Sequence, residues 1–323
     1  MFTFAGKLHI NNFSCIMANV IKIKKGLDIN LKGKASDVLL NGGKSDSYAI
    51  VPDYYNGITP KVVAKVGEKV KAGSVLMIDK NRPEIKFVSP VSGEVTAVNR
   101  GEKRKVLSIV VKPDAQIEYE EFGKKNVASL QGAEVKEVLL NAGMWPFIKQ
   151  RPYDIVAAPL DTPRDIFVSA FYSAPLAPNF DFIVKGQEAD FQTGLNALAK
   201  LTNGKVYVGV RSGSVVSGMK GVEIVEVEGP HPAANVGVQI NHIKPVNKGE
   251  VVWTVNPADV IVIGRLFNKG VADFSRMVAI TGSETTERGY VKTISGCTIK
   301  SLVNGKVLGQ EHIRIISGNV LTG

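Results

Sequence analysis

Short hydrophobic runs separated by glycine dominate residues 60–113. In VGEKVKAGSVL, apolar and polar residues alternate, and Gly67 and Gly73 interrupt the runs. The later segment SPVSGEVTAV repeats this pattern. Alternation with a period of two, broken by glycine, predicts short β-strands joined by tight turns. We therefore expect residues 60–113 to form a compact β domain. It is preceded by an N-terminal segment, residues 17–59, that opens with a strand.

A helix and then a series of alternating strands and helices follow. Val135, Val138 and Leu139 recur at helical spacing, and Gly143 suits a C-terminal stop. DIFVSAF is predicted to be a buried strand, and KVYVGVRSG and VEIVEVEG are predicted to be two further strands. DFIVKGQEADFQTGLNALAKLTNG is predicted to begin with a strand end and to continue as a helix capped by Asn-Gly. This alternation predicts a parallel α/β sheet in residues 126–256.

The pattern changes again beyond Pro257. DVIVIGRLFNKG is predicted to be a helix, and residues 275–323 to fold as strand, turn, strand, short helix and final strand. Because the chain stops just after that last strand, we expect this module to be truncated at its C-terminus. Residues 1–16, which precede a second methionine, are predicted to be a disordered extension. The chain is thus expected to be a multi-domain α/β protein.

Composition and charge are compatible with a soluble protein. Apolar residues make up 44% of the chain and charged residues 22%. The formal net charge is +10, and residues 1–125 hold 21 Lys and Arg against 13 Asp and Glu. This local excess fits an anionic partner or a membrane surface, and solubility alone explains it equally well.

Cysteine and histidine usage argues against metal centres within this chain. Cys15 and Cys297 form no CxxC motif, which disfavours iron–sulfur or structural zinc sites and points to a reducing compartment. The histidines are scattered, with no pair at metal-ligand spacing. No apolar run approaches the length of about 18 residues that spans a bilayer, and no secretory signal is evident. These features predict a cytoplasmic protein.

Two segments of the α/β region lack the residues that bind nucleotide. Phosphate binding needs backbone N–H groups that no side chain shields, which is why glycine runs open such helices. In LLNAGMWPFIKQRPYD only Gly143 is available, and Trp145, Pro146 and Phe147 occupy positions that should be small. VSAFYSAPL has no carboxylate to contact a nucleotide, and GVRSGSVVSG has the wrong glycine spacing and is predicted to be a hairpin turn. We expect a Rossmann-like fold without flavin.

Five separated motifs carry a resemblance to a known family. They are IKIKKGLDI, KFVSPVSGEVTAVNRG, PLAPNFDFIVKGQEADF, GPHPAANVGVQINHIKPV and RIISGNVLTG. From about Ile21 onward the chain is similar to the A subunit of sodium-translocating NADH:quinone oxidoreductases. RMVAITGSETTERGYVKTISGCTIKSLV looks like the soluble-ligand-binding β-grasp module, also called SLBB. The C subunit of the Rnf complex and the flavin-binding subunit of respiratory NADH dehydrogenases share this module. An Rnf protein is disfavoured here because clustered cysteines are missing.

Residues 60–113 also resemble the barrel-sandwich hybrid of biotinyl and lipoyl carriers. A working carrier presents a modifiable lysine at a hairpin tip, where this chain has Arg82 followed by Pro83. Lys80 lies nearby without the usual flanking residues, so a scaffold is favoured over a carrier modified at Lys80.

The family resemblance implies a peripheral protein on the cytoplasmic side of the bacterial inner membrane. It would dock on the membrane subunits, chiefly the B subunit, within a complex that reduces ubiquinone. FMN, FAD, iron–sulfur and NADH would belong to other subunits, and no cofactor, metal or nucleic acid would be bound here.

A quinone site needs an apolar cleft with aromatic walls and one or two hydrogen-bond donors. Trp145 and Phe147 are candidate walls, and Arg151 and His231 are candidate donors. The aromatics fit equally well as core residues that fill the former flavin cavity, and His231 as a loop residue bonded to the backbone. A purely structural assembly role, with the quinone site elsewhere in the complex, remains the alternative.

Overall fold

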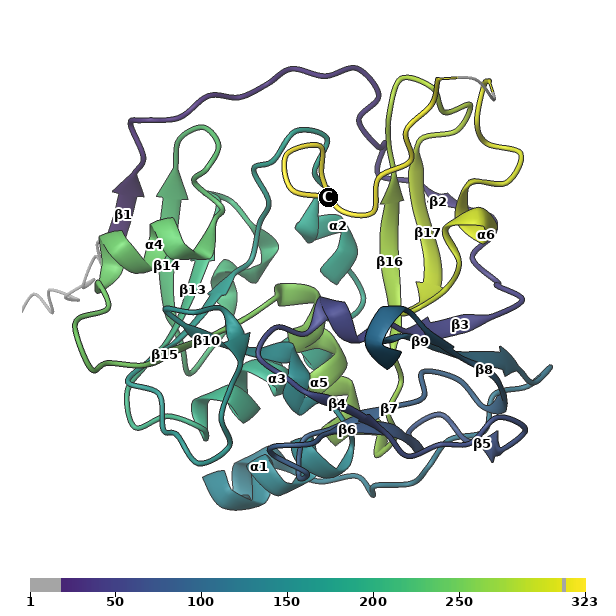
Figure 1. Ribbon diagram of the computed structural model, residues 1–323. Helices are drawn as coiled ribbons and strands as arrows, with labels where there is room; N and C mark the ends of the chain where they lie inside the picture. Colours follow the sequence, from purple (N-terminus) through teal and green to yellow (C-terminus); the bar gives the residue numbers. More distant parts are fainter. Residues whose placement is uncertain (1–18, 310–311) are drawn as a thin grey trace, which may run out of the picture.

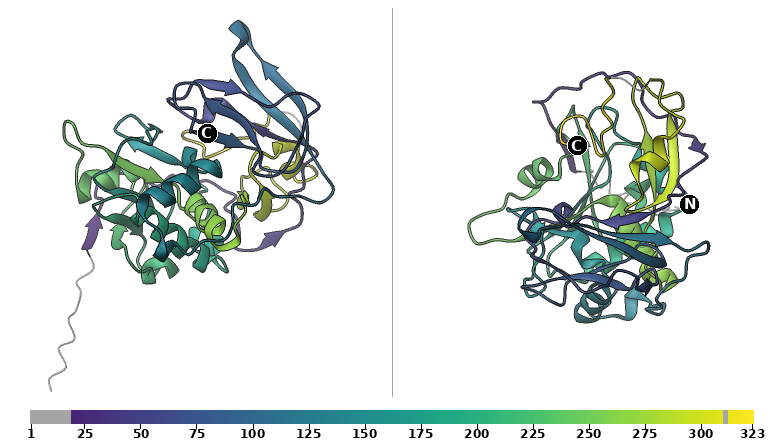
Figure 2. Two further views of the ribbon diagram at one scale, coloured as in Figure 1. Left: turned by 90° about the horizontal axis from the view of Figure 1, so that it is seen from below. Right: turned by 45° about the vertical axis from the view of Figure 1, so that its right-hand side comes forward.

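The computed structural model describes residues 19–309 and 312–323. A central α/β sheet lies beside a barrel-sandwich hybrid and a smaller β-grasp sheet (Figure 1). Seen from below, the barrel-sandwich hybrid projects from one side of the α/β domain (Figure 2). The predicted fold class is therefore confirmed. The predicted extension, residues 1–16, lies outside the described residues.

The barrel-sandwich hybrid consists of two small sheets with a common core. One sheet has the strand order β3-β9-β8-β5 and the other β4-β6-β7. Leu76, Met77 and Phe87 are buried inside. Positive φ angles at Gly67 and Gly73 confirm the predicted glycine turns. The strands are β3 (Tyr48–Ile50), β4 (Pro60–Val62), β5 (Lys69–Val70), β6 (Val75–Asp79), β7 (Lys86–Val88), β8 (Gly93–Arg100) and β9 (Val106–Pro113), with the short 3-10 helices η1 (Pro52–Tyr54) and η2 (Glu102–Arg104).

The α/β domain is built on a seven-stranded sheet with the order β1-β14-β13-β12-β15-β10-β11. Its first five strands run parallel, as predicted, whereas β10 runs antiparallel to β15, and β11 in turn runs antiparallel to β10. The strands are β1 (Asn19–Lys22), β10 (Ile148–Arg151), β11 (Ile155–Val156), β12 (Ile166–Ser169), β13 (Val206–Val210), β14 (Glu223–Glu228) and β15 (Val252–Val255). The helices are η3 (Val127–Ser129), α1 (Gly132–Asn141), η4 (Trp145–Phe147), α2 (Phe180–Val184), α3 (Glu188–Ala199), η5 (Val215–Gly218), α4 (Val236–Ile243) and α5 (Pro257–Lys269).

Helices cover both faces of this sheet. Phe191 of α3 and Val260 of α5 belong to the same core as Val168 of β12. Ile240 of α4 packs with Phe167, whose side chain points to the opposite face because successive strand residues alternate. All four residues of β12 are buried, as expected for a central strand covered on both sides.

The β-grasp sheet has the order β16-β17-β2. Its elements are β16 (Ser275–Ile280), β17 (Gly289–Ile294), the short helix α6 (Ile299–Val303) and β2 (Leu39–Leu40). The predicted N-terminal segment therefore contributes β1, β2 and β3 to three different sheets. Residues 23–38, which we call the strap, cross the top of the molecule between β1 and β2 (Figure 1).

Four local predictions were wrong. Residues 180–184 form helix α2 instead of a strand end, with Asn179 as the N-cap. Helix α3 ends at Ala199, before the predicted Asn-Gly cap. GVRSGSVVSG is no hairpin turn, because it joins the parallel strands β13 and β14 through η5. No final strand occurs within residues 312–323, where turns and bends take its place.

The hairpin tip between β6 and β7 is fixed to the neighbouring domain. Arg82 Nε donates to Asp79 at 2.8 Å, and the Asp79 side chain is only 1% exposed. The other guanidinium nitrogens donate to the carbonyl of Val156 at 3.1 Å and of Gly57 at 2.8 Å. Lys80 is exposed beside this anchor. A tip held in this way favours the scaffold interpretation over a swinging carrier arm.

Arg82→Ala should lower the free energy of unfolding by about 2 kcal/mol, because it leaves a buried carboxylate without its cation. Lys80→Ala at the same tip should change it by less than about 0.5 kcal/mol. Urea denaturation of the full chain measures both. Equal effects of the two substitutions would show that the tip is not anchored by Arg82.

Candidate functional site: a pocket at the carboxyl edge of the sheet

The strand order places a topological switch point between β12 and β15. From β12 the chain proceeds to β13 and β14 on one side, and β15 then pairs on the other side of β12. In open α/β sheets, ligands bind at the carboxyl ends of the strands at such a point. Here the hydroxyl of Tyr172, just after β12, donates to Asn256 Oδ1, just after β15, at 3.2 Å. This hydrogen bond closes the crevice itself.

A pocket remains beside the closed crevice, above the carboxyl ends of β12 and β13. We call it the carboxyl-edge pocket, and its volume is about 180 Å³. Phe171, Tyr172 and Phe180 form aromatic walls. The remaining lining comes from the strap, from the loop before α2 and from the turn after β13: Lys34, Ala170, Ala177, Pro178, Asn179, Asp181, Arg211 and Ser214.

Two cations supply the available donors of this pocket. Arg211 stacks on Phe171 at 4.5 Å and donates to the carbonyls of Val227 at 3.1 Å and Gly229 at 2.8 Å. A guanidinium has five N–H groups, so donors remain after these two bonds. Lys34 forms no ion pair within the described part of the chain. Asp181 is occupied, because it accepts hydrogen bonds from the Ser214 hydroxyl at 2.6 Å and from the Val215 amide at 3.3 Å.

Partly buried titratable groups gather where the three domains meet, next to Tyr172. Arg276 of β16 pairs with Asp259 of α5 at 2.9 Å, and Lys149 of β10 lies 5.3 Å from the ring centre of Tyr55. Burial, and then the Asp259 carboxylate, raises the pKa of Tyr172 and raises the pKa of Tyr55 to about 12. Burial also lowers the pKa of Lys149. Both tyrosines therefore remain neutral hydrogen-bond donors at physiological pH.

Trp145 and Phe147 lie in η4, between α1 and β10. Trp145 is fully buried, donates from its indole to the carbonyl of Ala157 at 2.8 Å and meets Trp253 edge to face at 5.4 Å. Phe147 is partly buried and packs against Phe274 at 6.1 Å. Neither residue lines the carboxyl-edge pocket.

Gly143 allows the segment before η4 to approach the barrel-sandwich hybrid closely. Its φ is +67°, and a Cβ there would come within 2.5 Å of the Val88 side chain of β7. The sequence LLNAGMWPF thus packs the α/β domain against the barrel-sandwich hybrid. The rings of Trp145 and Phe147 have the contacts of core residues in this structure.

The structure does not bring the four predicted quinone residues together. Arg151 pairs in register with Val252, the first residue of β15, so it lies at the amino edge of the parallel strands. Its partner is Asp154 at 3.4 Å. His231 follows β14, which three strands separate from β10. A role of Trp145, Phe147, Arg151 and His231 in quinone binding stays a prediction.

His231 is the predicted residue that lies nearest to the carboxyl-edge pocket. Its Nδ1 is 3.0 Å from the hydroxyl of Ser173, which follows the pocket residue Tyr172. Its backbone N–H donates to Asp28 of the strap at 2.8 Å. The imidazole thus contacts a side chain. From the sequence alone, a hydrogen bond between His231 and the backbone was equally acceptable. Lys34, Tyr172 and Arg211 were not predicted from the sequence. The aromatic pair Phe171 and Tyr172, directly after a buried strand, could have indicated a pocket wall.

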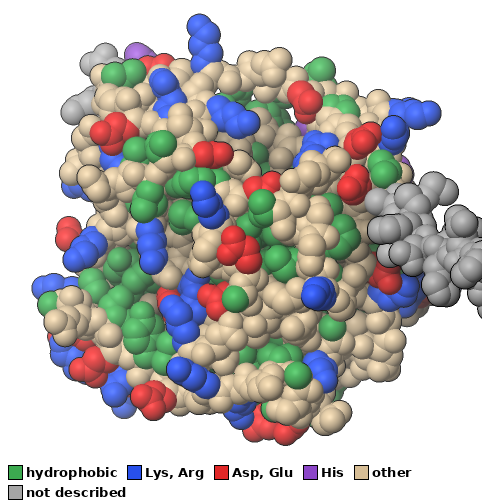
Figure 3. Space-filling model, turned by 180° about the vertical axis from the view of Figure 1, so that it is seen from behind, with side chains coloured by type: hydrophobic (Ala, Val, Ile, Leu, Met, Phe, Trp, Pro, Cys, Tyr) green, Lys and Arg blue, Asp and Glu red, His purple; other side chains and the backbone are tan. Residues whose placement is uncertain are grey.

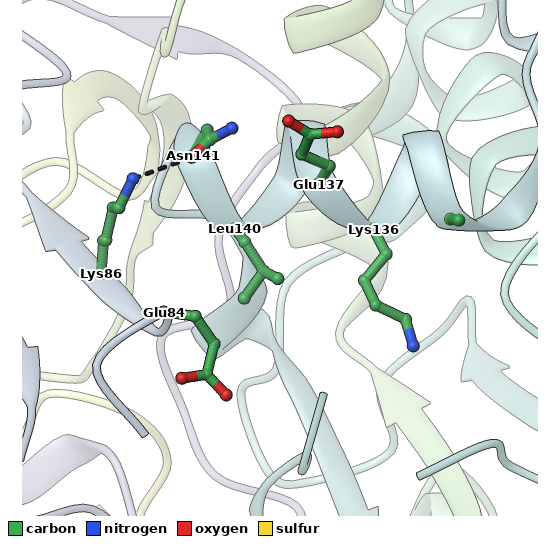
Figure 4. A pocket seen from close by; sticks show the side chains of 7 residues that line it. Glu84, Lys86, Lys136, Glu137, Leu140 and Asn141 are labelled. Atoms are coloured by element: carbon green, nitrogen blue, oxygen red, sulfur yellow. Dashed lines mark hydrogen bonds between the residues drawn. The ribbon is translucent and has the colours of Figure 1, made fainter. Parts of the chain in front are cut away.

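A larger hollow, of about 330 Å³, lies between β7 and α1. Ala133 and Leu140 line it together with charged side chains (Figure 4). Its two lysines are already engaged, since Lys86 donates to Asn141 at 2.8 Å and Lys136 to the carbonyl of Pro159 at 2.6 Å. An open groove with an aliphatic floor and a charged rim lacks the convergent polar groups of a ligand site.

Residues 19–309 and 312–323 contain neither a cluster of metal ligands nor a membrane-spanning helix. No group of three or more His, Cys, Asp or Glu side chains is arranged to hold a metal ion. No helix in the same ranges is both long and apolar enough to cross a membrane.

Comparison with protein families identifies the architecture. Residues 21–114 match the NqrA N-terminal barrel-sandwich hybrid domain, residues 130–272 the NqrA second alpha/beta domain and residues 277–323 the NQRA C-terminal domain. The A subunit of the Na(+)-translocating NADH-quinone reductase of Hahella chejuensis is 38% identical over 309 residues, which are 94% of this chain and 69% of that protein. The chain belongs to this family. The resemblance found in the sequence is thereby confirmed.

Other members of the NqrA family agree with this assignment. The A subunit of Neisseria meningitidis is 36% identical and that of Photorhabdus laumondii 37% identical, each over 94% of this chain and 69% of the relative. The names of these relatives describe them as A subunits of a sodium-translocating NADH-quinone reductase, an oxidoreductase. Among solved structures, an NAD+-reducing NiFe-hydrogenase matches with a TM-score of 0.34 and 10% identity, over 60% of this chain and 45% of that one.

Proposed function

We propose that this protein binds the head group of ubiquinone in the carboxyl-edge pocket. It docks on the cytoplasmic side of the membrane subunits, chiefly the B subunit, and carries no redox cofactor. FMN, FAD, iron–sulfur centres and NADH belong to other subunits in this proposal. The observation that carries it is the meeting of three aromatic walls with the Lys34 ammonium and the remaining Arg211 N–H groups at the carboxyl edge of a Rossmann-like sheet.

The chemistry of the pocket favours a quinone over a nucleotide. A quinone presents two neutral carbonyl oxygens, which the Lys34 ammonium and the remaining Arg211 N–H groups suit as donors. For a phosphate, the Asp181 carboxylate in the same lining offsets one of the two positive charges. The loop from Ala170 to Asn179 contains no glycine, and α2 is only five residues long. The backbone cradle for a pyrophosphate is therefore missing there.

The residues predicted from sequence take supporting roles in this proposal. His231 orients Ser173 at the border of the pocket. The other three residues support strand β10 and the elements next to it: Trp145, Phe147 and Arg151. Strand β15 separates β10 from the strands that carry the pocket. The aromatic walls that the sequence led us to expect are then supplied by Phe171, Tyr172 and Phe180.

Calorimetric titration of the full chain with a short-chain ubiquinone tests the proposal. We expect saturable binding that Tyr172→Ala weakens roughly tenfold through the lost ring contact. Lys34→Gln should weaken it roughly fivefold through the lost charge-assisted hydrogen bond. Lys80→Gln, an equal charge change at an exposed site, should leave the affinity unchanged. FMN should neither bind nor compete.

Two results would contradict the proposed site. Without saturable binding, the chain would have a purely structural assembly role, and the quinone site would lie elsewhere in the complex. If Trp145→Phe abolished binding while Tyr172→Ala left it intact, the cleft would lie at η4, where the sequence first suggested it.

A further inference from the structure

The strap is the most exposed apolar segment that is also strongly basic. Leu27, Ile29 and Leu31 are 70%, 43% and 44% exposed. They recur at every second position of a segment without regular secondary structure, in which the amide of Leu31 donates to the carbonyl of Ile29 at 3.1 Å and forms a tight turn. Soluble proteins rarely expose such a row of aliphatic side chains without a partner.

Lysines flank this row at both ends. Lys24 and Lys25 precede it, and Lys32 and Lys34 follow it. None of the four forms an ion pair within the described residues. The single acidic residue between positions 23 and 34, Asp28, already accepts the backbone N–H of His231 at 2.8 Å. By contrast, the back of the molecule shows positive and negative side chains interspersed (Figure 3).

The body of the protein holds the strap in this position. The amide of Ile23 donates to the carbonyl of Glu228 and that of Leu27 to the carbonyl of His231, both at 2.9 Å. At the other end the amide of Gly282 donates to the carbonyl of Gly33 at 2.8 Å. The apolar row between these anchors is therefore presented outward in a fixed place.

We propose that the strap rests on the surface of a lipid bilayer that contains anionic lipids. Aliphatic side chains inserted at the headgroup boundary, with lysines around them, are the combination that binds such a surface. Three aliphatic side chains on one short segment offer much less area than the roughly 1,000 Å² that a specific protein interface buries. Charge and area together favour anionic lipid over a protein partner.

The proposed contact between the strap and the bilayer adds to the proposed quinone site, and its biological role rests on that proposed function. Lys34 belongs both to the strap and to the lining of the carboxyl-edge pocket. A strap lying on the bilayer would bring the pocket close to the lipid phase, where the hydrophobic tail of a quinone resides. The head group would then enter the pocket while the tail stays in the membrane.

Vesicle flotation of the full chain, without quinone, tests the contact. We expect binding to vesicles of phosphatidylcholine mixed with phosphatidylglycerol, little binding to phosphatidylcholine alone, and release by high salt. Lys24→Gln, Lys25→Gln and Lys32→Gln combined should weaken binding roughly a hundredfold, about fivefold for each lysine. Leu27→Ser should weaken it roughly tenfold.

Matched controls lie outside the strap. Lys61→Gln, Lys65→Gln and Lys80→Gln combined remove the same charge from exposed sites of the barrel-sandwich hybrid, and Leu160→Ser removes a leucine that is 93% exposed. Both should bind vesicles like the wild type. The proposal is overturned if the wild type ignores anionic vesicles, or if the controls lose as much binding as the strap variants. The quinone titration uses no lipid, so each proposal can fail separately.

Discussion

Gly264→Ala should destabilise the folded chain by about 3 kcal/mol, because two helices touch at this residue. A Cβ at position 264 would lie 1.7 Å from the carbonyl oxygen of Asp190 in α3. The reverse contact is equally close, since a Cβ at Gly194 would lie 2.1 Å from the carbonyl oxygen of Val260 in α5. The contacting atoms are backbone atoms, which cannot rotate away as a side chain can. The two helices would therefore have to move apart, which would loosen the core that they form with the sheet.

Gly237 provides the matched control for this prediction. It lies in helix α4, and a Cβ there would meet no atom within 4 Å. Gly237→Ala should therefore stabilise the chain by about 0.5 to 1 kcal/mol through helix propensity alone. Urea denaturation measures both substitutions. Similar effects at the two glycines would refute the close helix crossing.

Arg265→Met should cost about 3 kcal/mol, because it removes a buried guanidinium that pairs with two partly buried carboxylates, of which Asp273 keeps Lys269 as a partner. The Arg265 side chain is 5% exposed and lies 3.3 Å from Asp273 and 3.6 Å from Asp190. It also donates to Gln187 at 2.6 Å and to the Ser275 carbonyl at 2.9 Å, which ties α5 to the start of α3 and to β16. Loss of this residue would loosen the β-grasp module from the α/β domain.

The pH dependence of this substitution provides a second readout. Burial by itself would raise the pKa of Asp273, but hydrogen bonds from Ser275 and the Arg265 charge lower it to about 2. A lowered pKa stabilises the fold above the unfolded value of about 3.9, and this stability disappears as the pH falls toward 2. The cost of Arg265→Met should accordingly be constant above about pH 5 and should shrink in more acidic buffer. Arg100→Met, at an exposed position, should change stability by less than about 0.5 kcal/mol at any pH. A cost that stays the same at low pH would contradict the assigned pairing.

The spacing of hydrophobic residues predicted those strands and helices that have the same pattern of burial along their whole length. Hydrophobic patterns predicted the strands β12, β13 and β14 and the helices α1 and α5, because burial of one or both faces of a strand, or of one stripe of a helix, produces a regular signal. Helix α2 was predicted as a strand end, since five residues are too few to show a helical period. The connection through η5 was predicted to be a hairpin turn. Glycine and serine are common both in hairpins and in connections between parallel strands, so they did not distinguish the two.

The site was harder to predict than the fold because it depends on strand order. No local pattern shows that β15 pairs beside β12, so the switch point and its closure by Tyr172 and Asn256 were invisible. Lys34 reaches the same pocket from more than a hundred residues away in the sequence. The sequence alone showed that the segment around Trp145 is poor in glycine. Its packing between two domains, however, required the contact of Gly143 with Val88.

A structure of the full chain with a short-chain ubiquinone tests the central claim most directly. The proposal predicts the quinone ring between Phe171, Tyr172 and Phe180, with its carbonyl oxygens within hydrogen-bond distance of Lys34 and Arg211. A quinone bound beside Trp145 and Phe147, or in the groove between β7 and α1, would contradict it. So would an empty carboxyl-edge pocket at saturating quinone.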